Sequence, residues 1–297
     1  MPLNKPPIAA LFGWLARRRT LPGVAVLCYH GLRCDRDPEG VMPFEGIHVR
    51  ASTFAAHCRA IVRYAHPISL DDWRASLGGE RALPPRPVVI TFDDGYRSVL
   101  TEGLPVLEAL NLSAAVFVAT GAVARNEMLW SDAVASARGE PAVEALKSLS
   151  HQEWAKAIDG VPCAVSRSDP RALLTPDEVA HLSASGRIEV GGHTENHPIL
   201  ARAPREVQAA EIQACADAIE RWTGRRMRAF AYPNGRVGLD LSDETRQLVA
   251  AVGADLAFTA ESGLARRGAD RLLLPRFTIT NGVTVAHLLN RIARSWS

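Results

Sequence analysis

The sequence has few aromatic residues, few cysteines and almost no excess charge of either sign. Aromatic residues make up 6% of its 297 residues, and the formal net charge is +2 with the histidines counted as neutral. So small a net charge gives no electrostatic basis for binding nucleic acid, and we expect no such partner. The five cysteines are odd in number and contain no C-x-x-C pair. We therefore expect reduced thiols, several of them filling the core, and no metal site built from cysteine.

The sequence also lacks a signal peptide of the usual form. The apolar run Ile8 to Ala16 is too short to span a bilayer, and Arg17-Arg18-Arg19 follows it instead of a small-residue cleavage site. Its apolar side chains fall on one face of a helix. Two interpretations stay open: a helix on an anionic membrane surface, and a helix packed on the domain or a frayed extension. We expect a cytoplasmic protein, with peripheral contact to the inner membrane through residues 8–19 as an option.

The rest of the chain has the composition of a folded domain with a sizeable core, because 47% of the residues are apolar and 22% are charged. No internal repeat or low-complexity tract interrupts it. Short apolar runs alternate with helical patterns, which predicts parallel strands and an α/β fold. Seven such strands predict a closed or nearly closed barrel. The predicted strands are Val24–Tyr29, Pro87–Phe92, Ala114–Thr120, Ile188–Gly192, Arg228–Tyr232, Ala254–Thr259 and Leu272–Leu274.

Several helices are predicted between these strands. Ser52–Tyr64 reads as a helix with Ser52 at its N-cap, and Pro204–Thr223 as a long helix. Residues 131–185 are largely helical, with Thr175 as an N-cap followed by proline in the first turn. We therefore expect an N-terminal helical extension over residues 1–22, and one barrel domain over residues 23–297 with a helical insertion after the third strand.

Polar residues gather just past the carboxyl ends of the predicted strands. In β/α barrels that rim is where active sites are assembled. The residues are His30, Asp93, Asp94, His193, Tyr232, Asn234, Glu261 and Arg276.

The first motif at the rim is Thr91-Phe92-Asp93-Asp94-Gly95-Tyr96. Adjacent residues at a strand end point to opposite sides, so Asp94 is a candidate metal ligand while Asp93 stays free as a base. Gly95 lets the backbone turn sharply. A lone D-D-G is also an ordinary turn.

The second motif is His193-Thr194-Glu195-Asn196-His197-Pro198. Two histidines four apart meet at one cation if the segment forms a helical turn. Two imidazoles and one carboxylate suit zinc, cobalt or nickel and leave coordination positions open. Taken alone, the motif also fits two surface histidines. Its occurrence together with D-D-G, each at a strand end, favours a metal site.

These paired motifs resemble the polysaccharide deacetylase (NodB-homology) superfamily, carbohydrate esterase family four, from about Val24 to Ile279. The resemblance implies a distorted, TIM-barrel-like (β/α)7 barrel. It also implies a divalent metal ion, zinc first and cobalt or nickel next, held by Asp94, His193 and His197, with Asp93 as the catalytic base. A third motif, Phe230-Ala231-Tyr232-Pro233-Asn234-Gly235, would shape the groove and offer the Asn234 N–H to the oxyanion.

The sequence departs from the family pattern at two positions. Many members carry an arginine where this chain has Ala231, and a late Leu-x-His whose histidine is the general acid; Leu272 to Phe277 contains no histidine. Leu27-Cys28-Tyr29-His30-Gly31 resembles the Y-H motif of the poly-N-acetylglucosamine deacetylase branch, which implies His30 as the acid. Arg276 is a candidate to orient Asp93 in place of the missing arginine. The alternatives are a structural histidine and an arginine that closes the barrel rim.

Substrate contacts are expected at the mouth of the barrel. Tyr96, Tyr232 and Pro233 belong to the motifs, and Trp130 follows the third strand. Trp130 either stacks on a sugar ring or fills the core, as buried tryptophans commonly do.

The resulting prediction is a metal-dependent hydrolase that removes N-acetyl groups from an amino-sugar polysaccharide or glycolipid. One alternative is a deacetylase of a lipid-linked sugar intermediate in surface polysaccharide biosynthesis. Another, from a different class, is a non-catalytic glycan-binding barrel. The retained base and metal triad disfavour it, because a binding protein has no use for a free base.

Overall fold

A computed structural model describes residues 23–40 and 42–294 of the chain. The predicted extension over residues 1–22, with its membrane-facing segment 8–19, lies outside the described residues and stays a prediction. Within the described part, no helix combines the length and apolar character that crossing a bilayer requires.

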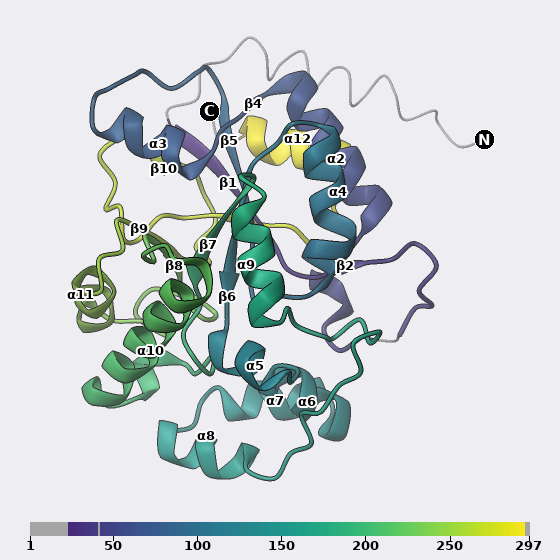
Figure 1. Ribbon diagram of the computed structural model, residues 1–297, viewed down its shortest axis with the longest axis vertical. Helices are drawn as coiled ribbons and strands as arrows, with labels where there is room; N and C mark the ends of the chain where they lie inside the picture. Colours follow the sequence, from purple (N-terminus) through teal and green to yellow (C-terminus); the bar gives the residue numbers. More distant parts are fainter. Residues whose placement is uncertain (1–22, 41, 295–297) are drawn as a thin grey trace.

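The described residues form a parallel sheet that curls into a distorted barrel, with helices around it (Figure 1). The strands follow one another in the order β10-β1-β5-β6-β7-β8-β9, and every neighbouring pair is parallel except the antiparallel pair of β1 and β10. The bounds of these strands are β1 Gly23–Tyr29, β5 Pro87–Phe92, β6 Ala114–Val118, β7 Ile188–Gly192, β8 Ala229–Ala231, β9 Leu256–Phe258 and β10 Ala265–Arg266. The predicted α/β barrel is confirmed.

The seventh strand differs from the prediction of Leu272–Leu274. Leu274 makes only an isolated bridge with Phe258 of β9, and a separate two-residue strand, β11 (Phe277–Thr278), pairs with β1. Between them stands Pro275, which has no N–H to give to a strand ladder. The barrel is therefore closed by two short pairings, of Leu274 with β9 and of β11 with β1.

Six further elements, three strands and three helical turns, are too short for a hydrophobic pattern to reveal. Two short strands pair with each other, β2 (Leu32–Arg33) and β3 (Val49–Arg50), and a third, β4 (His66–Pro67), extends the sheet beside β5. A 3-10 turn at Glu45–Ile47, a π-helical turn at Val99–Gly103 and a 3-10 turn at Leu200–Arg202 complete the short elements.

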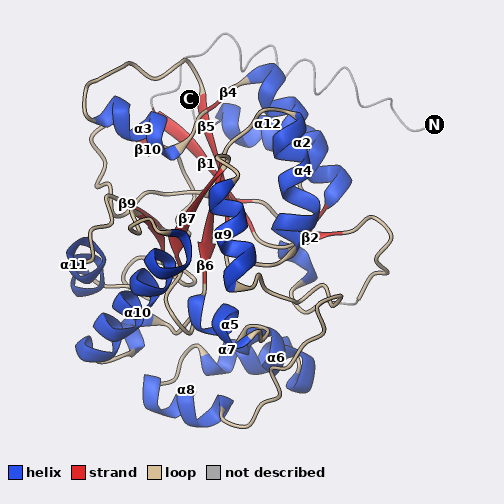
Figure 2. Cartoon of the chain, viewed as in Figure 1, coloured by secondary structure: helices blue, strands red, loops and turns tan. Residues whose placement is uncertain are grey.

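The helices occupy most of the predicted positions with shifted ends (Figure 2). Arg50, not Ser52, is the N-cap of α2, and the Ser52 hydroxyl instead donates to Asp35. Thr175 does cap α9, in a capping box with Glu178 and with proline in the first turn. The helices are α2 Ala51–Tyr64, α3 Leu70–Leu77, α4 Leu104–Ala109, α5 Thr120–Arg125, α6 Trp130–Arg138, α7 Glu140–Leu146, α8 His151–Ile158, α9 Pro176–Ala184, α10 Arg205–Thr223, α11 Asp243–Ala251 and α12 Val285–Arg294.

The predicted helical insertion is present as α5 to α8, which lie past the carboxyl end of β6 (Figure 1). Residues 159–175, which were expected to be largely helical, contain no helix. The lobe has its own small core, in which the Trp130 and Trp154 rings pack edge to face at 5.6 Å. The insertion thus stands over the rim that carries the polar motifs.

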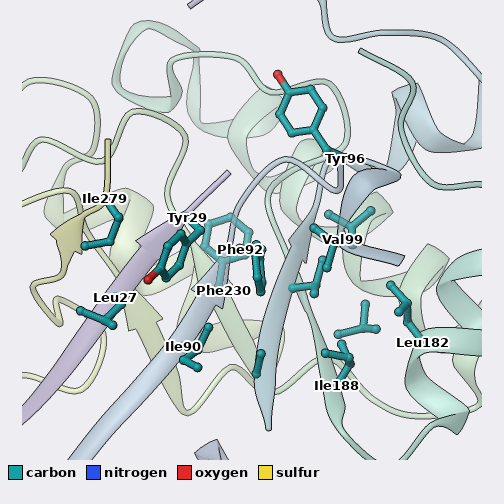
Figure 3. Close-up of a cluster of buried hydrophobic side chains, with 14 of the residues drawn as sticks. Leu27, Tyr29, Ile90, Phe92, Tyr96, Val99, Leu182, Ile188, Phe230 and Ile279 are labelled. Atoms are coloured by element: carbon teal, nitrogen blue, oxygen red, sulfur yellow. The ribbon is translucent and has the colours of Figure 1, made fainter. Parts of the chain in front are cut away.

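Successive side chains along each strand point to opposite faces of the sheet, so the core consists of two clusters. One set of side chains, including Leu27, Ile90 and Phe230, packs toward the surrounding helices (Figure 3). The other set, including Val26 and Phe117, fills the barrel interior. Because strand side chains alternate with period two, the interior set continues to residues 28, 30, 93 and 193.

The amino end of the barrel is tied by Arg74 of α3. Its guanidinium group, 9% exposed, donates to both Glu189 oxygens at 2.7 Å and, through Nε, to Asp255 at 2.6 Å. Glu189 lies on β7, and Asp255 directly precedes β9. One side chain therefore links three elements that are far apart in the sequence.

We predict that Arg74→Ala lowers the free energy of unfolding by about 1–3 kcal/mol, the usual contribution of hydrogen bonds to charged groups that are partly shielded from water. Urea unfolding measures the change. Arg228→Ala is the matched control, because Arg228 also contacts Asp255 but is 49% exposed. It should cost less than about 1 kcal/mol. Equal costs for the two variants would contradict the linking role of Arg74.

Candidate active site

The barrel interior ends in an ion pair between the first aspartate of the D-D-G motif and the closing segment. Asp93 accepts from Arg276 Nη1 at 2.7 Å and from Nη2 at 2.6 Å, and both side chains are almost fully buried. Arg276 Nε donates to the Thr259 carbonyl, and Nη1 also donates to the Thr91 hydroxyl. Burial alone would raise the pKa of Asp93, but the Arg276 charge outweighs it and the pKa is lowered. Asp93 is therefore a carboxylate held in one orientation.

The second aspartate points to the two histidines of the H-T-E-N-H-P motif. Asp94 Oδ1 lies 3.4 Å from His193 Nε2 and 3.5 Å from His197 Nε2. Zinc ligands in a tetrahedral site, with metal–ligand distances of roughly 2.0–2.2 Å, stand about 3.4 Å apart. The spacing and the donor set therefore fit a divalent cation, and the three ligand atoms lie within 4.8 Å of one another.

The environment of each histidine leaves Nε2 available to such a cation. His193 Nδ1 lies 2.7 Å from the Ala231 carbonyl, which favours the tautomer with the proton on Nδ1. Burial would lower the pKa of His193, but its hydrogen bond to Asp94 and the charge of Asp93 raise it. Burial and the neighbouring His193 lower the pKa of His197 to about 4, so His197 is neutral at pH 7.

The backbone of this motif is not the helical turn that the four-residue spacing predicted. Residues 193–199 form an irregular bend. Thr194 and His197 both have positive φ, 65° and 58°, a region that non-glycine residues rarely adopt. Asp94 is similar, with φ 75°. Both segments of the candidate metal site depart from regular structure, as strained backbone at functional sites commonly does.

Three contacts that the sequence analysis missed hold this bend. The Thr194 hydroxyl accepts from the His197 N–H, and the Trp130 indole N–H donates to the His197 carbonyl at 2.9 Å. Glu211 of α10 accepts from the Asn196 N–H and side-chain amide at 2.8 and 2.9 Å. A carboxylate on the buried face of a long amphipathic helix was the only sequence signal for Glu211.

The four predicted substrate contacts occupy buried positions instead of an open groove. Trp130 is 6% exposed and supports the metal-ligand bend. Tyr232 is 1% exposed, with its hydroxyl donated to the Leu272 carbonyl, and Pro233 is buried beside it. Tyr96, also 1% exposed, lies at the edge of the core cluster with its hydroxyl directed away from it (Figure 3). In this structure their side chains support the site and do not form its surface.

The Tyr96 hydroxyl belongs to a buried polar group below the rim. It donates to Asp132 Oδ2 at 2.8 Å, and burial raises the pKa of Asp132 to about 7. The His48 ring packs edge to face on Tyr96, and burial lowers the pKa of His48 to about 3. His48 is fully buried.

The third motif turns tightly at Asn234, which has φ 53°. The next residue, Gly235, has φ 69°, and a Cβ there would lie 2.8 Å from the Ala260 nitrogen, so only glycine fits. Among the described residues the Asn234 backbone N–H has no hydrogen-bond partner. The motif thus presents an unpaired amide of a residue that is partly open to solvent.

His30 lies past the end of β1, on the interior face and partly exposed. Its Nδ1 atom is buried without a hydrogen-bond partner among the described residues. One of its ring nitrogens, the Cys28 sulfur and an Asp93 oxygen all lie within 4.8 Å of one another. The structure therefore brings His30, Asp93, Arg276 and the three metal-ligand candidates to one rim.

Fold and site together define a (β/α)7 barrel with an Asp-His-His cluster that could hold a cation and an arginine-held aspartate beside it. The sequence profile described as polysaccharide deacetylase matches residues 80–257, more than half of the chain. The chain belongs to the polysaccharide deacetylase family.

Curated relatives include the poly-β-1,6-N-acetyl-D-glucosamine N-deacetylase of Escherichia coli K12, which is 26% identical over 235 residues. The match covers 76% of this chain and 32% of that protein, so the chain spans about a third of the length of the curated relatives it matches.

Solved structures share the fold at low identity. The Streptococcus pyogenes deacetylase PplD in complex with acetate has a TM-score of 0.68 at 20% identity, covering 92% of this chain and 99% of that one. The de-N-acetylase of Aggregatibacter actinomycetemcomitans has a TM-score of 0.67 at 18% identity, and the match covers 90% of this chain and 99% of that one. IcaB from Ammonifex degensii has a TM-score of 0.63 at 20% identity, and the match covers 91% of this chain and 97% of that one.

The Trp130 contact generates a prediction for metal binding. Trp130→Phe keeps an aromatic ring in the core of the insertion but removes the donor to the His197 carbonyl. Losing an interaction of this kind typically lowers metal affinity by roughly 10–100-fold. Competition with a chromophoric chelator measures the affinity. Trp154→Phe is the matched control, because Trp154 lies in the same cluster and its indole N–H has no partner among the described residues. An unchanged affinity in Trp130→Phe contradicts the supporting role.

Proposed function

We propose that this chain is a divalent-metal-dependent hydrolase that removes N-acetyl groups from an amino-sugar glycan and releases acetate. One observation carries the proposal: Asp94, His193 and His197 converge within 4.8 Å beside an aspartate that Arg276 holds ionised. A non-catalytic glycan-binding barrel has no need for that oriented carboxylate.

Asp94, His193 and His197 would hold the cation, with zinc preferred and cobalt or nickel as substitutes. When bound, it polarises the acetyl carbonyl and lowers the pKa of water from about 15.7 towards about 7. Three protein ligands leave coordination positions for water and substrate.

Asp93 takes the proton from the attacking water in this scheme. Its lowered pKa keeps it ionised, and the two Arg276 contacts fix the direction of its oxygens. A positioned general base typically contributes about 10²–10⁴-fold to the rate. Arg276, on the closing segment, replaces the arginine that other members carry at the position of Ala231.

Asn234 acts on the carbonyl oxygen of the substrate amide, and His30 acts on its nitrogen. The unpaired Asn234 N–H donates to the oxyanion as the tetrahedral centre forms. His30 protonates the departing amine, and its ring nitrogen is within 4.8 Å of the Asp93 carboxylate, so both groups reach the same carbon centre. The products are acetate and a free amino sugar.

The substrate class is supported by the Escherichia coli relative, which is named as an N-deacetylase of poly-β-1,6-N-acetyl-D-glucosamine. We assign this chain an N-acetylglucosamine-containing polymer on that basis. A lipid-linked sugar intermediate and peripheral contact with the inner membrane stay sequence-based predictions, because residues 8–19 lie outside the described structure.

Acetate release tests the proposal directly. We expect release from β-1,6-linked N-acetylglucosamine oligosaccharides that stops with a chelator and returns with Zn²⁺. Chitooligosaccharides and an N-acetylated lipid extract serve as parallel substrates that separate polymer from lipid-linked sugar. Release that persists in chelator contradicts the metal, and no release from any N-acetylated glycan contradicts the function.

A second prediction isolates the base. Asp93→Asn should retain the cation, because its three ligands are unchanged, and should lower kcat by about 10²–10⁴-fold. Asp132→Asn is the matched control, since Asp132 is also a buried carboxylate near the rim, and its side-chain hydrogen bond within the described residues comes from Tyr96. Metal analysis and thermal unfolding accompany both assays. Full activity in Asp93→Asn refutes the assignment.

A further inference from the structure

A second group of ligand atoms lies directly beside the first. Cys28, His30 and Asp93 each offer one atom, and the three atoms lie within 4.8 Å of one another. None of the three is a ligand in the site of Asp94, His193 and His197. Two observations suggest that they suit a cation: the Cys28 sulfur is 3.4 Å from Asp93 Oδ2, and His30 Nδ1 is buried without a partner among the described residues.

We propose that Cys28, His30 and Asp93 form a second, weaker site for a soft divalent cation such as Zn²⁺ or Cd²⁺, and that occupation of this site inhibits the enzyme. The inhibition rests on the proposed function, whereas the binding does not. The absence of a C-x-x-C pair predicts no metal site built from cysteine. Here the ligands come from alternate residues of one strand and the end of its neighbour.

The register of β1 and β5 explains the cluster. These strands are parallel, and Cys28 pairs with Thr91 while Tyr29 pairs with Phe92. Alternation then places Cys28 and His30 on the interior face, beside Asp93 at the end of β5. Zinc bonds of roughly 2.3 Å to sulfur and 2.1 Å to oxygen in a tetrahedral site put these atoms about 3.6 Å apart. The observed 3.4 Å needs little adjustment.

Each ligand atom is available to a cation. Arg276 uses one lone pair on each Asp93 oxygen, and a carboxylate offers about four acceptor positions. The Cys28 thiol contact with Asp93 is replaced on binding: the S–H bond breaks, its proton leaves to solvent, and the sulfur bonds to the cation. Neutral His30 contributes a ring nitrogen, and as a partly exposed residue it marks the route of entry.

The second site should be the weaker of the two. A cation there must displace the thiol proton, and it faces the buried positive charge of Arg276 and the cation of the first site. Its occupation engages the proposed base and the proposed acid together. Activity should therefore rise with the first equivalent of Zn²⁺ and fall at higher concentration.

Cadmium titration of the full-length chain tests the binding. A cadmium–thiolate bond gives an ultraviolet charge-transfer band, which the cysteine-free first site cannot produce. We expect one thiolate-bound Cd²⁺ per chain in the native protein and loss of the band in Cys28→Ser. His30→Gln, the second variant, should keep the band and weaken the affinity at least about tenfold. Thermal unfolding verifies that both variants are folded.

The control is the double variant Cys34→Ser/Cys163→Ser. These two cysteines are only half-buried, so binding to any accessible thiol would occur there. We expect the double variant to retain the band. A band that survives Cys28→Ser, that disappears in the double variant, or that never forms in the native chain overturns the proposal.

To test the inhibition, acetate release in excess Zn²⁺ is measured for each variant and compared with the maximal release of the same variant. Excess Zn²⁺ should inhibit the native chain and the double variant, and should inhibit Cys28→Ser at least about tenfold less effectively. Equal inhibition of Cys28→Ser refutes the inhibitory role. A Cys28-dependent band without any acetate release supports the second cation site and refutes the proposed function. Failure of the second site and failure of the proposed function are therefore distinguishable.

Discussion

The buried ion pair of Arg276 and Asp93 is the contact on which both the barrel and the site depend. Removing two charges from water is costly, and their attraction offsets that cost only with excellent geometry and further hydrogen bonds. Both conditions are met: the contact is bidentate, and Thr259 and Thr91 take further guanidinium hydrogens. The strand ladder is sparse at this closure, where Pro275 separates an isolated bridge from a two-residue strand. A side-chain contact therefore joins the last segment to β5 where backbone pairing is sparse, and the same contact orients the proposed base.

The metal site is built from backbone conformations that resist prediction because each is unfavourable by itself. Non-glycine residues in the left-handed region cost on the order of 1–3 kcal/mol each. Asp94, Thr194 and His197 all lie there, and so does Asn234. Such residues persist only where the surroundings over-determine them. Trp130 of α6, Glu211 of α10 and the Thr194 hydroxyl of the bend itself supply those surroundings for the histidine bend.

The sequence therefore predicts some parts of this molecule well and others poorly, for identifiable reasons. β1 and β5 are continuous apolar runs that are buried on both faces, so the parallel-stranded barrel follows from local pattern. The convergence of Asp94, His193 and His197 could be predicted from the sequence, because short motifs mark the strand ends that carry these residues. His193 and His197 converge through an irregular bend and not through a helical turn, because histidine spacing does not encode φ. The burial of Trp130 and Tyr96 does not follow from the sequence, because burial by an insertion is a long-range property.

Alternation also imposes a constraint that no single residue reveals. A histidine at the end of β1 that reaches the reacting centre must face the interior, and the residue two positions earlier then faces the interior as well. Position 28 thus lies beside the proposed base whatever side chain it carries. An aliphatic residue there would only fill space, whereas cysteine adds a donor to Asp93 and a sulfur ligand within reach of His30. The strand geometry that places the proposed general acid at the rim therefore also places the side chain of residue 28 beside the proposed base.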